Sequence, residues 1–150
     1  MSAVRSDQDA FVLDTSAVLA LIEAEDGAKT VRDIIARGAA VLPWIAALEL
    51  HYITAREVSA EEADARLILL HSAGVALRTM DGDHLLRQAS ALKAALAVSL
   101  ADALIAAVAV TEDATLVHKD PEYEALTGRV RMLALPFKPR ARRGEPPSVT

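Results

Sequence analysis

Four acidic residues of this 150-residue sequence stand where a carboxylate could do chemistry: Asp14, Glu49, Asp102 and Asp120. Carboxylates that are brought together repel one another strongly unless a divalent cation neutralises them. The sequence has no cysteine and only four histidines, so we expect a hard ion held by oxygen, either Mg²⁺ or Mn²⁺. Such an ion activates a water molecule for phosphodiester cleavage without a side-chain nucleophile. We therefore predict that all four acids are metal ligands and catalytic residues.

Asp102 gives the strongest signal of the four, because it is the only charged residue between Lys93 and Glu112. The surrounding segment is apolar nearly all round, which indicates a buried helix. An unpaired carboxylate inside a protein core costs several kcal/mol or becomes protonated. Asp102 must therefore meet a metal, a cation or a set of donors, and we interpret it as a functional residue rather than half of a structural ion pair.

The other three acids each have a simpler interpretation. Asp14 and Asp120 both follow a short apolar run and precede a helical one, so each also fits an N-cap that accepts hydrogen bonds from the next turn. Thr15 and Ser16 would cap the first helix equally well, so capping alone does not require an acid there. Glu49 lies on the apolar side of its predicted helix, from which it could also reach water. The functional interpretation therefore rests on the four acids taken together.

The elements that must position these acids alternate between strands and helices. Apolar runs predict strands at 11–13, 39–42, 75–79, 114–118 and 130–135. Helical spacing and capping signals predict helices at 17–22, 27–37, 44–57, 59–74, 83–93, 99–110 and 121–128. This alternation predicts an α/β fold with three layers, in which helices cover both faces of a mainly parallel central sheet of four to five strands. Functional groups gather at the carboxyl ends of such strands, where Asp14 and Asp120 lie.

Local signals also predict how individual helices begin and which face they bury. Ser59 followed by Glu62 has the form of a capping box, and either Asp81 or Asp83 can cap the helix at 83–93. In the helix at 44–57, the apolar face is expected to comprise Trp44, Ile45, Leu48 and Tyr52.

Length and composition predict one compact domain. We expect a polar N-terminal extension at 1–9, the folded domain at 10–135 and a Pro/Arg-rich disordered tail at 136–150. The N-terminus has no apolar leader, and the apolar segment 94–111 is interrupted by Asp102, so a cytoplasmic protein without membrane contact is expected. The net charge of −5 argues mildly against a non-specific coat on nucleic acid. Three histidines without metal-ligand spacing are expected at the surface or the core edge: His51, His71 and His84.

Over about residues 10–135 the chain resembles the PIN-domain ribonucleases, and in particular the VapC toxins of type II toxin–antitoxin modules. Four stretches carry the resemblance: VLDTS at 12–16, IAALEL at 45–50, SLADALIAA at 99–107 and LVHKDPEY at 116–123. They place the four acids on the family's four acidic positions, and the third stretch is the most specific match. His118 departs from the pattern, because the family more often has a hydroxyl residue there.

The resemblance implies a metal-dependent endoribonuclease that acts as a homodimer. It also implies a small antitoxin that wraps the toxin and blocks its acidic groove, commonly with an arginine near the metals. Ser16 either orients Asp14 or a metal-bound water, as the corresponding hydroxyl does in the family, or serves only as a helix cap. Glu122 either replaces or assists Asp120.

Three other protein classes fit the acids less well. A haloacid-dehalogenase-type phosphatase needs a second aspartate two residues after the first, where this chain has Ser16. A receiver-like signalling domain needs an acidic pair near the first strand, which is also missing. The remaining alternative is a catalytically inactive PIN-like binding module that engages an antitoxin or RNA. Because all four positions are acidic, we favour catalysis.

Overall fold

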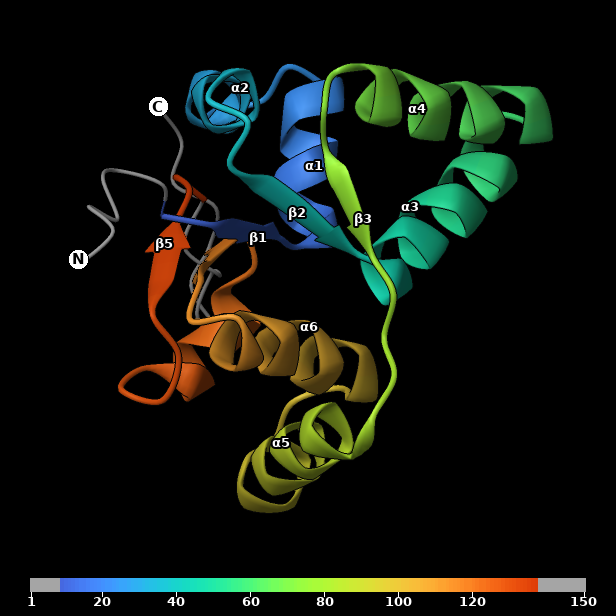
Figure 1. Ribbon diagram of the computed structural model, residues 1–150. Helices are drawn as coiled ribbons and strands as arrows, with labels where there is room; N and C mark the ends of the chain where they lie inside the picture. Colours follow the sequence, from blue (N-terminus) through green and yellow to red (C-terminus); the bar gives the residue numbers. More distant parts are fainter. Residues whose placement is uncertain (1–8, 138–150) are drawn as a thin grey trace, which may run out of the picture.

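The computed structural model describes residues 9–137, and the chain folds around one five-stranded sheet (Figure 1). All neighbouring strands are parallel, in the order β3-β2-β1-β4-β5. The strands are β1 (Phe11–Leu13), β2 (Ala40–Pro43), β3 (Ala76–Arg78), β4 (Thr115–His118) and β5 (Met132–Ala134). The predicted α/β class and its parallel sheet are confirmed. Residues 1–8 and 138–150, which hold most of the predicted N-terminal extension and tail, lie outside the described residues.

Seven helices connect the strands within residues 9–137: α1 (Thr15–Ile22), α2 (Ala28–Ala36), α3 (Trp44–Glu57), α4 (Ala60–Ser72), α5 (Asp83–Ala95), α6 (Leu100–Thr111) and the 3₁₀ helix η1 (Pro121–Leu126). Figure 1 shows α1, α2 and α4 on one side of the sheet and α5 and α6 on the other. Crossovers between parallel strands are right-handed, so helices change face where the strand order reverses. That reversal occurs between β1 and β4, and their carboxyl ends flank the crevice where open α/β sheets bind ligands.

The two central strands and α6 form the middle of the hydrophobic core. Val12 and Leu13 of β1 and Leu116 and Val117 of β4 are completely buried. Helix α6 presents mainly alanines to the sheet, and these small side chains let its backbone approach closely. The apolar segment at 94–111 is divided between two helices, because α5 ends at Ala95 and α6 begins at Leu100. Within residues 9–137, no helix has the length and apolar character needed to cross a membrane.

The predicted apolar face of α3 is wrong. Trp44, Leu48 and Tyr52 are 50%, 41% and 40% exposed, and Ile45 alone of the predicted four packs against the core. The buried residues of this helix are Ala46, Ala47, Leu50 and Thr54. Helix α3 packs against α1, α4 and α6, and smaller side chains suit this crowded position better than the bulky stripe does.

Of the predicted helix caps, the one at α4 is confirmed and the one at α5 is wrong. Ser59 caps α4 as predicted, because its hydroxyl accepts a hydrogen bond of 3.0 Å from the backbone N–H of Glu62. Neither Asp81 nor Asp83 caps α5. Gly82 occupies the N-cap position with a left-handed φ of 88°, and the carboxylate of Asp83 instead accepts a hydrogen bond from Arg87. Glycine adopts this positive φ readily because it has no Cβ, so it can begin a helix without a capping side chain.

Candidate metal centre

Asp14 is the innermost acid of the candidate site. It follows β1 directly, is only 4% exposed, and caps α1 through a hydrogen bond of 2.9 Å from the backbone N–H of Ser16 to Oδ2. The Ser16 hydroxyl donates to the same oxygen, and the Tyr123 hydroxyl donates to Oδ1 at 2.6 Å. Asp14 is therefore both a helix cap and a member of the acidic site, so the two interpretations of this residue do not exclude each other.

Asp102 lies in the first turn of α6 rather than deep inside the core. Ser99 caps this helix by accepting a hydrogen bond of 3.1 Å from the backbone N–H of Asp102. The carboxylate is partly exposed, and Oδ1 accepts a hydrogen bond of 3.0 Å from Tyr123. Partial burial and the negative charge of Asp14 raise the pKa of Asp102, while the hydrogen bonds from Tyr123 and Ser99 oppose that rise. Helix α6 is largely buried as predicted, whereas Asp102 itself is only partly buried, and this partial burial still disfavours its charged form.

Glu49 reaches the same region from α3. Its Oε1 accepts a hydrogen bond of 2.9 Å from the hydroxyl of Thr15, the first residue of α1. Burial raises the pKa of Glu49, the Thr15 hydrogen bond lowers it, and the charges of Asp14 and Asp102 raise it further. Glu49 is thus close enough to both aspartates for their negative charges to raise its pKa.

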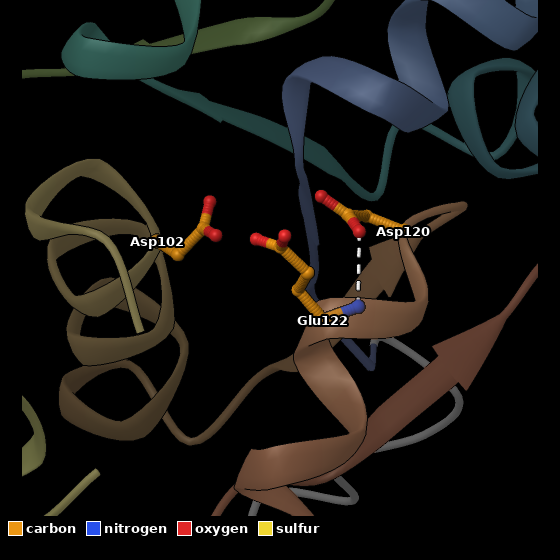
Figure 2. Close-up of side chains that lie close together, drawn as sticks. All are labelled: Asp102, Asp120 and Glu122. Atoms are coloured by element: carbon orange, nitrogen blue, oxygen red, sulfur yellow. Dashed lines mark hydrogen bonds between the residues drawn. The ribbon is translucent and has the colours of Figure 1, made fainter. Parts of the chain in front are cut away.

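Asp120 and Glu122 complete the acidic site from the loop after β4. Asp120 caps η1, because its Oδ1 accepts a hydrogen bond of 2.9 Å from the backbone N–H of Glu122. Carboxylate oxygens of Asp102, Asp120 and Glu122 lie within 4.8 Å of one another, and we call these three residues the outer trio. Figure 2 shows the Glu122 side chain pointing into the space between the two aspartates. Asp14 and Glu49 lie outside the trio.

Neutral groups supply the hydrogen bonds to the predicted acids. Within residues 9–137, none of Asp14, Glu49, Asp102 and Asp120 forms an ion pair with a basic side chain. Lys119 is adjacent in sequence, but its ammonium contacts Oε2 of Glu25 at 3.3 Å and the carbonyl of Asp26 at 3.2 Å. The donor set is rich in carboxylate oxygen and poor in compensating charge, which fits a hard divalent cation such as Mg²⁺ or Mn²⁺.

Two residues of the site were not identified from the sequence as its members. Tyr123 is completely buried and connects Asp14 to Asp102. Burial, together with the charges of those two acids, raises the pKa of its phenol far above the ordinary value, so the hydroxyl remains a donor. The only signal in the sequence is that a buried tyrosine hydroxyl needs a polar partner.

The second is His118, whose part in the site the sequence left undetermined. It is 1% exposed, and its Nδ1 accepts a hydrogen bond of 3.2 Å from the backbone N–H of Asp120. Its ring packs against Tyr123 with centroids 4.9 Å apart. Burial lowers the pKa of His118, which favours the neutral imidazole. His118 therefore shapes the turn that carries Asp120.

The remaining predicted residues lie as follows. The Ser16 hydroxyl donates to Asp14 and accepts a hydrogen bond of 2.8 Å from the backbone N–H of Lys119, so it ties α1 to the end of β4. His51 pairs with Asp64 at 2.8 Å, and His71 and His84 are exposed, as expected from their spacing.

Comparisons with known proteins identify the family and the fold. The family model of the PIN domain matches residues 11–128. A chain of VapBC2 from Rickettsia felis, crystallised with a promoter DNA fragment, is 19% identical with a TM-score of 0.70, covering 85% of this chain and 99% of that one. A chain of DNA-bound VapBC from Salmonella typhimurium is 19% identical with a TM-score of 0.69, covering 83% and 97%.

A third solved structure, VapC20 of Mycobacterium tuberculosis, is described as a toxin that cleaves the sarcin–ricin loop. It is 20% identical with a TM-score of 0.64, covering 79% of this chain and 95% of that one. No curated protein sequence matches the chain. At these identities the likeness to solved structures establishes the fold.

Proposed function

The chain belongs to the PIN-domain family, and from that premise we propose that it is a metal-dependent endoribonuclease, the toxin component of a type II toxin–antitoxin system. One observation carries the proposal. Asp14, Glu49, Asp102 and Asp120 converge at one end of the sheet, and within residues 9–137 none of these four forms an ion pair with a basic side chain. Such an arrangement is costly for a merely structural cluster and useful for holding a divalent cation.

We assign the acids to two roles. Asp14, Glu49, Asp102 and Asp120 are proposed as metal ligands and catalytic residues, and Glu122 assists Asp120 because it belongs to the outer trio. When bound, Mg²⁺ or Mn²⁺ would activate a water molecule and neutralise charge on the scissile phosphate. Glu49 lies outside the outer trio and has a raised pKa, which suits a carboxylate that takes up a proton from the attacking water.

The proposed substrate is RNA, whose phosphates are themselves negative. An acidic groove attracts a phosphate backbone only after a cation has reversed the local charge. We therefore expect RNA binding to depend on metal as strongly as cleavage does, and tight RNA binding in chelator would contradict the proposal. Because an RNA-cleaving toxin acts where cellular RNA is, we also propose a cytoplasmic location.

The proposed protein partners are a small antitoxin and a second copy of the chain. Several structural neighbours are described as toxin–antitoxin complexes, including one from Klebsiella pneumoniae with a TM-score of 0.66. An antitoxin arginine inserted among the acids would supply the positive charge that the described residues do not. Co-purification with the antitoxin and light scattering would test the complex and the homodimer respectively.

The decisive experiment is cleavage of a pool of structured RNAs by the purified, antitoxin-free protein. Cleavage is expected with Mg²⁺ or Mn²⁺ and not with chelator. Asp102→Asn keeps the size of the side chain but removes a charged ligand, so the rate should fall roughly 10³-fold. Asp64→Asn, on the surface of α4, is the matched control and should retain wild-type activity.

Two results would contradict the proposal. Equal activity in all samples, chelator included, would indicate a contaminating nuclease. If no metal and no RNA gave cleavage while the protein bound a small partner tightly, the inactive PIN-like binding module would be the better assignment.

A further inference from the structure

Tyr123 joins three separate elements of the candidate site through one hydroxyl group. The residue lies in η1, and its side chain is completely buried. Its oxygen is 2.6 Å from Oδ1 of Asp14, at the end of β1, and 3.0 Å from Oδ1 of Asp102, in the first turn of α6. The two carboxylate oxygens therefore cannot be further apart than these two distances combined.

A phenol has a single proton to donate, so it can satisfy only one of the two acids at a time. The shorter distance favours Asp14. Asp14 also accepts two hydrogen bonds from Ser16, so most of its acceptor capacity is filled by groups of the protein itself. Asp102, in contrast, belongs to the outer trio. The hydroxyl of Tyr123 thus stands between the inner acid and the acids that are open to an ion.

We propose that Tyr123 is a positioning residue that holds Asp14 and Asp102 at the separation needed to bind a divalent cation. The inference rests on the proposed function. It concerns the hydroxyl group alone, because phenylalanine would fill the same space and keep the ring contact with His118. Without the hydroxyl, two partly desolvated carboxylates would face each other across a small void, and their repulsion would favour other side-chain positions.

Tyr123→Phe tests the proposal, and the second tyrosine of the sequence provides a matched control. Tyr52 lies on α3, is 40% exposed, and its ring packs beside Arg56. Calorimetric titration with Mn²⁺ measures ion affinity without any substrate. Tyr123→Phe should weaken Mn²⁺ binding roughly 10- to 100-fold, the usual cost of losing a group that orients metal ligands. Tyr52→Phe should bind Mn²⁺ as the wild type does.

Steady-state cleavage of RNA supplies an independent readout. A positioning role predicts that kcat falls at saturating metal while KM for RNA stays within about twofold. If Tyr123→Phe binds Mn²⁺ and cleaves RNA as the wild type does, the proposal is overturned and the metal centre stands. If the wild type itself binds no Mn²⁺, both the proposed function and this inference fail, and the wild-type titration alone shows it.

A second variant covers the case in which Tyr123→Phe does not fold. Adding Asp102→Asn removes one of the two charges that the hydroxyl separates. Recovery of the folded state in this double variant would support the role of the hydroxyl between two anions. Failure to recover it would assign Tyr123 to core packing and overturn the proposal.

Discussion

Acidic side chains meet very different partners in two regions of this molecule. In the hairpin of α3 and α4, Glu62 pairs with Arg66 at 3.3 Å, and Asp64 pairs with His51 at 2.8 Å. The Arg66 guanidinium also donates to Thr54 at 2.9 Å, so the basic side chain is itself satisfied. In the candidate site, the hydrogen bonds to Asp14, Glu49, Asp102 and Asp120 come from hydroxyl and backbone N–H groups instead.

The difference matters because a neutral donor orients a carboxylate without cancelling its charge. In the helix hairpin, Glu62 has a cationic neighbour in Arg66, and Asp64 is hydrogen-bonded to His51. At the candidate metal centre the repulsion persists, and it contributes to the raised pKa of both Glu49 and Asp102. The kinds of partner, rather than the number of acids, distinguish the surface of the hairpin from the candidate metal centre.

The largest effect is expected when a fixed cation is built into the site. Glu122→Lys would place an ammonium among the outer trio and give the site the kind of partner that the hairpin already has. Two unit charges about 4 Å apart interact by about 4 kcal/mol at an effective dielectric constant of about 20, and Mn²⁺ carries two charges, so Mn²⁺ affinity should fall by at least roughly 10³-fold. Titration calorimetry measures this directly.

The control for that variant is Glu57→Lys, which makes the same change in net charge at the exposed end of α3. Its Mn²⁺ affinity should remain close to that of the wild type. Equal losses in both variants would mean that overall charge, and not the local arrangement, governs ion binding.

A smaller effect is expected from pH. The pKa values of Glu49 and Asp102 lie above their ordinary 4.5 and 3.8, so protons begin to compete with the ion at a higher pH than at unperturbed carboxyls. As pH falls through these raised pKa values, Mn²⁺ affinity should fall by up to about tenfold per pH unit for each proton displaced. Calorimetry in two buffers of different ionisation enthalpy counts those protons, and a count of zero throughout would contradict the expectation.

The smallest effect concerns stability, and its sign distinguishes the two regions. An acid whose pKa is raised by folding stabilises the protein most when protonated, so stability in chelator should decline as pH rises through the raised pKa. At neutral pH, Asp102→Asn should therefore increase the free energy of unfolding by about 1 kcal/mol or less, because a partly exposed charge is screened. Glu62→Gln breaks an ion pair and should decrease it by about 0.5 kcal/mol or less. Urea unfolding in chelator measures both changes, and changes of the same sign would contradict the expected difference between the two regions.

Much of the fold could be predicted because its signals are local. Each strand is a short apolar run, and the Ser59 cap and the glycines after several helices depend on neighbouring residues only. The buried face of α3 could not be predicted in this way, because two sets of residues follow helical spacing equally well. One is the exposed set that includes Trp44, Leu48 and Tyr52, and the other is the buried set that includes Ala46, Leu50 and Thr54. Contacts with α1, α4 and α6 decide between them, and α1 and α6 are distant in sequence.

The same difference between local signals and contacts distant in sequence applies to the candidate site. Asp14, Glu49, Asp102 and Asp120 were identified by their types and their places on predicted elements. Tyr123 was not identified, because its hydroxyl partners lie 109 and 21 residues away, and a tyrosine in a short polar segment carries no distinguishing pattern. From the sequence, Glu122 was expected either to replace or to assist Asp120, and the outer trio contains both.

Asp14 both caps α1 and belongs to the candidate site, and this combination has a genetic consequence. Asparagine caps helices about as well as aspartate, so Asp14→Asn should keep the first turn of α1 while removing a charge from the site. Aspartate and asparagine codons differ by a single base. Under the proposed function, a cell under selection to silence this chain therefore has a one-step route to a folded but inactive copy, which would still occupy the surfaces that recognise the proposed partners.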